Sequence, residues 1–282
     1  MIEFIQETLL LLPFLFVTYL VLEAIEAKAG SALESFLERA RSVGPAAGAL
    51  AGAIPQCGVS AAAASFYAGG VITVGALAAV FLSTSDELIP VLVSSRVPVP
   101  LMVKIVGIKV ICALGVGFLI DGLLAAMRHM RRQVSVHELC EHSHCGCHEH
   151  KGIFVPALIH TAEIFFFIVV ISGAIELCMH FFGEDCLNSL RLNRPFVGEL
   201  AAGALGLVPN CAVSVAAAKL YLSGAMSPGA LMASSFTGSG LGLLVLFRTN
   251  RNLKENLMIL AAVYVVGVVL GYLTGFLLET TL

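Results

Sequence analysis

Gly52-Ala-Ile-Pro-Gln-Cys-Gly-Val-Ser60 is the stretch that decides the fold, because a second copy follows as Gly206-Leu-Val-Pro-Asn-Cys-Ala-Val-Ser214. The two prolines, Pro55 and Pro209, lie 154 positions apart, and further identities continue at that offset without a gap. They include the triple alanines at 62–64 and 216–218, Tyr67 with Tyr221, Gly70 with Gly224, and the Leu-Leu pairs at 123–124 and 277–278. A single offset held over that distance indicates an internal duplication of the chain.

The composition places the chain in a membrane. Hydrophobic residues make up 58% of it and charged residues only 12%, about half the charged fraction of a soluble domain. Apolar runs long enough to cross about 30 Å of hydrocarbon recur throughout, so we expect a multi-pass protein of the cytoplasmic (inner) membrane. The first apolar run lacks the basic start and the cleavage site of a signal peptide. A net charge of −3 gives no indication of nucleic-acid binding.

Each copy of the motif interrupts an apolar segment, as the broken helices at a transporter's binding site do. The pieces at 44–54 and 57–68 are each too short to span the membrane, so they form either one broken helix or a hairpin. Basic residues concentrate in 28–41, 128–151 and 248–254. Only the hairpin places all three basic loops on the cytoplasmic side, because each half then crosses an odd number of times.

The predicted fold is therefore an all-α membrane protein with two inverted repeats of about five helical segments. Each repeat contains a broken helical hairpin at its Pro-Gln/Asn-Cys motif, and the two hairpin tips meet near the membrane midplane. The expected organisation is a first transmembrane repeat at 1–127, a cytoplasmic His/Cys-rich loop at 128–152 and a second transmembrane repeat at 153–282.

The duplicated motif supplies the first candidate ligands for a metal ion. Each copy carries one carboxamide, one thiol and one hydroxyl, which are Gln56, Cys57 and Ser60 in the first and Asn210, Cys211 and Ser214 in the second. Amide and hydroxyl oxygens suit hard cations, and thiolates suit soft ones. The alternative is that these side chains only satisfy backbone carbonyls left free by the proline.

Asp86 and Glu87 add two carboxylates within an apolar segment, where ionisable groups are costly and functional by default. The alternative is a capping box, with Thr84 as N-cap and Glu87 at N3. Their repeat counterparts are Gly240 and Leu241, so the two halves differ here. Candidate proton or charge partners for the site are Lys109, Lys219, Glu163 and His160.

The central loop is dense in imidazole and thiol groups. Its candidate metal ligands are His137, Cys140, His142, His144, Cys145, Cys147, His148 and His150. Such tracts bind zinc, copper or nickel, although the spacing is not that of a folded zinc finger. We interpret the loop as a cytoplasmic metal-capture or metal-sensing segment, with a flexible polar linker as the alternative.

The motif Pro55-Gln-Cys-Gly58, the run Ser83-Thr-Ser-Asp-Glu87 and the second motif Pro209-Asn-Cys211 resemble those of a known family. These are the ten-helix heavy-metal exporters, described variously as arsenic efflux proteins and as manganese transporters. The likeness covers nearly the whole chain, including the His-rich loop. It implies metal or metalloid efflux and ten membrane segments, but its conflicting substrate labels leave the ion open.

We therefore predict a secondary transporter that exports a divalent transition-metal ion, with manganese as first choice because oxygen donors dominate the site. Export is expected to be driven by proton antiport, with an acid such as Asp86, Glu87 or Glu163 releasing its proton as the metal arrives. The alternatives are an As(III) exporter using Cys57 and Cys211, or a membrane metal sensor built around the loop. We expect no enzymatic activity, no prosthetic group and no nucleic acid. The expected partners are the metal ion, the bilayer and a second copy of the chain.

Overall fold

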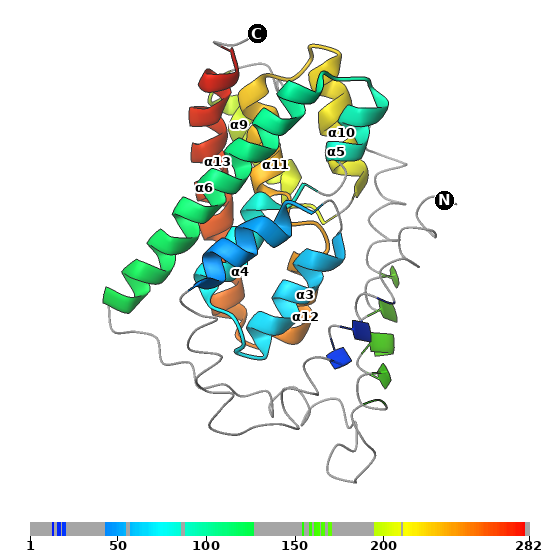
Figure 1. Ribbon diagram of the computed structural model, residues 1–282, viewed down its shortest axis with the longest axis vertical. Coiled ribbons are helices and arrows are strands. Elements are labelled where there is room, and N and C mark those ends of the chain that lie inside the picture. Colours follow the sequence, from blue (N-terminus) through cyan, green and yellow to red (C-terminus); the bar gives the residue numbers. More distant parts are fainter. Residues whose placement is uncertain are drawn as a thin grey trace.

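The computed structural model describes residues 43–54, 57–85, 88–126, 195–209 and 211–279, with scattered positions between 13 and 20 and between 154 and 170. Every regular element within these ranges is a helix, and none of them contains a strand (Figure 1). Among the described residues, three helical segments are long and apolar enough to cross a membrane: Val99–Ala126, Pro228–Thr249 (interrupted between 237 and 242) and Leu253–Leu278. The expected class, an all-helical membrane protein with several crossings, is confirmed at this level.

The helices fall into two matching sets. The first set consists of Val43–Gly52, α3 (Cys57–Ala68), α4 (Val74–Ser83), α5 (Leu88–Ser94) and α6 (Val99–Ala126). The second set consists of α9 (Val197–Gly206), α10 (Cys211–Leu222), α11 (Pro228–Thr237), α12 (Gly242–Thr249) and α13 (Leu253–Glu279). Every helix of the second set begins 154 positions after its counterpart, so the duplicated sequence gives a duplicated order of helices.

The same local signals start the matching helices α4 and α11. Their N-caps are Thr73 and Ser227, whose hydroxyl oxygens accept a hydrogen bond from the backbone N–H three residues later, at 3.0 Å and 3.1 Å. The turns before the caps contain Gly70 and Gly224, with φ values of 73° and 77°. Glycine adopts this left-handed conformation without the steric cost that a Cβ would add.

Two segments of the duplicated structure are broken in the middle. α4 ends at Ser83 and α5 begins at Leu88, while α11 ends at Thr237 and α12 begins at Gly242. No piece exceeds ten residues, or about 15 Å, which is half the thickness of the hydrocarbon core. The capping-box interpretation of Thr84 is wrong, because Thr84 ends α4 and its hydroxyl donates back to the carbonyl of Val80 at 2.7 Å.

Small residues allow the helix before each motif to lie close against the broken helix. A Cβ added at Gly44 would meet the Ala76 Cβ at 3.1 Å, and Gly52, two turns further on, lies against Ser83 near the end of α4. Val43–Gly52 therefore runs alongside α4 in the same direction. Gly206 lies against Thr237 in the same way, so α9 and α11 repeat the contact. Such close approach of backbones is how helices associate inside membranes.

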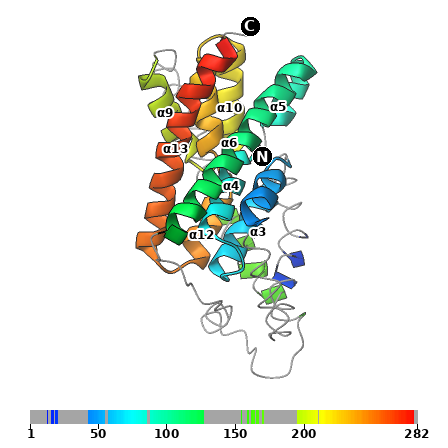
Figure 2. The same ribbon diagram turned by 60° about the vertical axis from the view of Figure 1, so that its left-hand side comes forward.

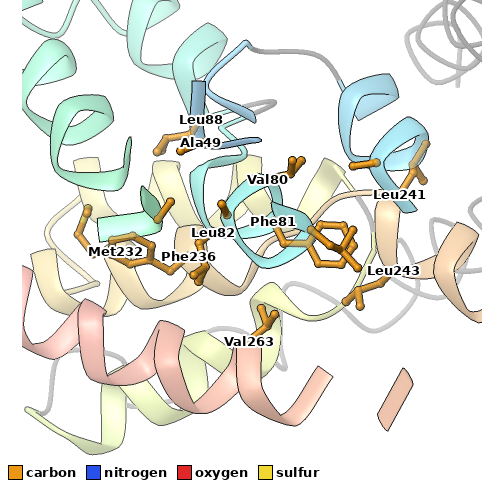
Figure 3. Close-up of a cluster of buried hydrophobic side chains, with 14 of the residues drawn as sticks. Ala49, Val80, Phe81, Leu82, Leu88, Met232, Phe236, Leu241, Leu243 and Val263 are labelled. Carbon is orange, nitrogen blue, oxygen red and sulfur yellow. The ribbon is translucent and has the colours of Figure 1, made fainter. Parts of the chain in front are cut away.

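The two sets also pack on each other. α12 of the second set packs on α3, and the counterpart pair, α10 and α5, packs in the opposite part of the molecule (Figure 1). Beside the contact of α12 with α3, Phe81 of α4 points toward Leu241 and Leu243 in the buried core (Figure 3). The long outer helices instead pack mainly within their own sets, α6 on α4 and α13 on α11.

α6 and α13 run in opposite directions along the long axis of the molecule. α6 leads away from α5 toward the end where α12 lies, whereas α13 starts at that end and rises to the C-terminus (Figures 1 and 2). The outer face of α6 exposes large apolar side chains such as Val103, Ile111 and Leu119. An apolar face of this kind is expected where a helix contacts lipid.

The close contact at Gly206 leads to a stability prediction. Gly206→Ala should destabilise the fold by about 1–3 kcal/mol, because the new Cβ would collide with the Thr237 hydroxyl and with the Ser234 backbone carbonyl. The control is Gly115→Ala on the outer face of α6, where an added Cβ meets nothing within 4 Å. Thermal unfolding of both variants in detergent tests this, and equal midpoints would show that α9 does not pack on α11 as described.

Candidate functional site

Both helix breaks line one small cavity. Its volume is about 30 Å³, the scale of one or two water molecules. Besides apolar residues such as Leu88, Val208 and Leu231, its lining includes hydroxyl-bearing residues of the first break (Thr84, Ser85), of α10 (Ser214) and of the last turn of α11 (Ser234, Ser235). Gly238 and Gly240 of the second break complete this polar side. Hydroxyl and backbone carbonyl oxygens are ligands that hard cations prefer.

A buried lysine joins the two breaks. Lys109 of α6 has no exposed surface, and its Nζ donates to the carbonyl oxygen of Thr84 at the first break. The same Nζ donates to the carbonyl and the hydroxyl oxygens of Ser235, at 2.9 Å and 2.6 Å, in the last turn before the second break. Burying an ammonium costs several kcal/mol unless acceptors surround it. The carbonyls at helix ends can serve because the helix does not use them.

One hydroxyl at the second break is unsatisfied. Ser239 is buried, and its Oγ has no hydrogen-bond partner in the described part of the chain. Its counterpart at the first break, Ser85, donates to the carbonyl of Ser83 at 3.1 Å. A buried polar group without a partner costs about 1–3 kcal/mol.

The duplication relates the cavity to an equivalent position in the structure. At that equivalent position the space is filled by side chains. The counterpart of the cavity-lining Ser235 is Phe81, a fully buried ring. The counterpart of Ser214 is Ser60, which is fully buried where Ser214 is only partly buried. A Cβ added at the neighbouring Gly242 would meet the Phe81 ring at 2.6 Å and the Ser60 Cβ at 2.8 Å.

Of the eight residues predicted for the central site, two have described side chains. Ser214 lines the cavity, whereas Ser60 packs against α12 in its filled counterpart. Cys57 and Cys211 are the first residues of α3 and α10, and their side chains lie outside the described set. Gln56, Asn210, Asp86 and Glu87 also lie outside the described residues. Their convergence on one cavity therefore stays a prediction.

The predicted charge partners take different positions. Lys109 is at the breaks, Lys219 is exposed in the last turn of α10, and Glu163 forms an ion pair with Arg248 at the end of α12. His160 and the loop ligands from His137 to His150 lie outside the described residues. Within the ranges that the structure does describe, no three His, Cys, Asp or Glu residues gather closely enough to hold a metal ion.

Sequence reasoning missed the hydroxyl-rich end of α11. Ser234 and Ser235 line the cavity, and the signal was available, because the run Ser234-Ser-Phe-Thr-Gly-Ser239 is the repeat counterpart of the segment that leads to Asp86. It also missed two acids within apolar helices. Asp121 accepts from the backbone N–H of Gly75 at 2.8 Å at the start of α4, and the buried Glu199 lies against Gly229 at the start of α11.

A family model matches residues 6–197 of the chain, about two thirds of its length. It is ArsP_2, and its description reads "Putative, 10TM heavy-metal exporter". No curated protein and no solved structure matches the chain.

Ser214 and its repeat counterpart Ser60 should differ in their accessibility to chemical reagents. In a cysteine-free background, Ser214→Cys should react with a small water-soluble thiol reagent at least about tenfold faster than Ser60→Cys, because only Ser214 lines a space that water can enter. The reaction rates of the two folded variants in detergent are compared. Equal rates at both positions would contradict the difference between the cavity and its filled counterpart.

Proposed function

The chain belongs to this family of ten-transmembrane heavy-metal exporters, and we propose that it exports a divalent transition-metal ion, with manganese as first choice. The ion would bind between the two helix breaks. The site is built for a cation, because oxygen donors from both halves meet there and two acids, Asp86 and Glu87, directly follow the lining residue Ser85.

The observation that carries the proposal is the shared cavity of the two broken helices. In a continuous helix each carbonyl is bound to an N–H four residues on, so it is not available to a substrate. A break frees several carbonyls, and in hydrocarbon they must find a partner in the protein, in water or in a bound ion. Two breaks at the same depth therefore give a ready set of oxygen ligands near the middle of the membrane.

The donor types favour manganese among the candidate ions. Hydroxyl, carbonyl and carboxylate oxygens suit Mn²⁺, whereas As(III) and other soft centres require thiolates. One observation favours the rival As(III) exporter: Cys57 and Cys211 each begin a helix, and Ser214, one turn after Cys211, lines the cavity. The N-terminus of a helix favours negative charge nearby, which suits a thiolate.

We further infer that the two halves are inverted repeats and that transport proceeds by alternating access. The opposite courses of α6 and α13 support the inversion (Figures 1 and 2). The hairpin is supported by Gly52 and Ser60, on either side of the first motif, which both lie near the last turn of α4. The difference between the cavity and its filled counterpart supports alternating access, because exchanging the two packings would open the other side.

Proton antiport is the proposed driving force. Asp86 and Glu87 are the preferred proton carriers, since they follow the first break directly. Glu163 is less suited, because its exposed carboxylate is already paired with Arg248 away from the breaks. A carboxylate that binds either a proton or a metal ion couples the two flows without any further machinery.

Transport of manganese and As(III) into inverted vesicles separates the two candidate substrates. If manganese is the substrate, Asp86→Asn should lower the initial rate of uptake at least about hundredfold, while Cys57→Ser should retain much of it. An As(III) exporter should show the reverse order. Empty vesicles and equal expression of both variants are the controls, and a wild-type protein that moves neither ion would refute the proposal.

The membrane orientation can be tested without knowing the ion. Single cysteines at positions 140 to 147, in an otherwise cysteine-free protein, should be labelled by an impermeant reagent only after the cytoplasmic side is exposed. Cysteines introduced near residue 97, between α5 and α6, should be labelled from the outside. Labelling of both positions from the same side would exclude the proposed odd number of crossings in each half.

A further inference from the structure

We infer that Lys109 is a tethered cation that occupies the oxygen-lined site when no metal ion is bound. The inference rests on the proposed function and names a residue that determines how tightly that site holds its substrate. Metal entry would require the ammonium to move away from the two breaks, and its return would help to expel the ion. Lys109 is thus a specificity-determining residue for transport and not only a structural cation.

The contacts of Lys109 place its charge between the two halves. Its side chain is completely buried, and Nζ donates to the Thr84 carbonyl of the first half. On the other side, Nζ lies 2.9 Å from the Ser235 carbonyl oxygen and 2.6 Å from its hydroxyl oxygen. An ammonium has three N–H donors, and both halves of the chain contribute acceptors to it here.

The acceptors of Lys109 belong to the residues that line the cavity. Thr84 and Ser235 contribute to the wall, so an ion that entered would draw on the same oxygens. An ammonium and a divalent metal ion both require oxygen ligands, and they repel each other strongly at short range in a low-dielectric site. They therefore compete for one set of ligands.

The repeat-related position in the second half carries no lysine. The repeat counterpart of Lys109 is Val263 of α13, which is buried in the apolar core (Figure 3). At Val263, apolar packing alone is sufficient to hold the long helix α13 against the broken helix α11. A second lysine on the same helix, Lys104, is more exposed and donates to the Leu277 carbonyl at 3.4 Å, away from the breaks. It provides a matched control.

The test measures Mn²⁺ binding and Mn²⁺ transport by the full-length protein and by Lys109→Met. Removing the competing charge should tighten Mn²⁺ binding at least about tenfold and lower KM, while kcat falls because the ion is no longer expelled. Lys109→Arg, which keeps the charge, should stay close to wild type in affinity, and Lys104→Met should match wild type in both. A purely structural role for Lys109 would leave the Mn²⁺ affinity unchanged or weaken it.

A second neutral variant covers the case in which Lys109→Met does not yield a monodisperse protein. Lys109→Gln then replaces it, because a carboxamide still donates hydrogen bonds but carries no charge. Wild-type binding of Mn²⁺ without tighter binding by the neutral variant overturns the tethered-cation inference alone. Absence of Mn²⁺ binding by both proteins overturns this inference together with the proposed manganese transport, whereas binding by the neutral variant only would support it.

Discussion

The hydrogen bonds of the backbone at the two helix breaks are the constraint on which the rest of the structure depends. Inside hydrocarbon, a free carbonyl or N–H group costs several kcal/mol, so a broken helix is tolerated only where other groups satisfy it. Here the Lys109 ammonium and the hydroxyl groups near the breaks supply those partners. The cost of the breaks is thus offset by polar side chains, and Thr84 and Ser235 among these residues also line the cavity between the breaks.

Duplication places the two breaks together. α4 and α11 both start at a hydroxyl N-cap, have the same length and make the same glycine contact with the helix before the motif, at Gly52 and Gly206. The halves pack on each other through the pairs α3 with α12 and α5 with α10. Both breaks lie inside this shared structure, where Thr84, Ser85 and Ser239 are buried.

Most of the fold could be predicted from the sequence, because the repeat is strong and periodic. The offset that aligns Pro55 with Pro209 also aligns the start of every described helix pair. The polar run Ser83–Glu87 signals the first break, whereas the break between α11 and α12 was not predicted. The walls of the site were harder to predict. Ser235 looks like an ordinary helix residue until the fold places it beside Lys109, and its counterpart Phe81 gives no hint of a hydroxyl. Contacts between distant segments depend on tertiary packing, which a local pattern does not encode.

The chemistry of the two halves has diverged where their backbones have not. Lys109 has an apolar counterpart in Val263, Asp86 has Gly240, and the Ser235 hydroxyl has the Phe81 ring. If both halves had kept the same charges, two equal sites would face each other and would repel two bound cations. With the charges in the first half and the extra hydroxyls in the second, the two halves instead carry different groups next to the breaks, while the order of their helices stays the same. Under the proposed transport, this division would give one binding site within a backbone that can close around it in two ways.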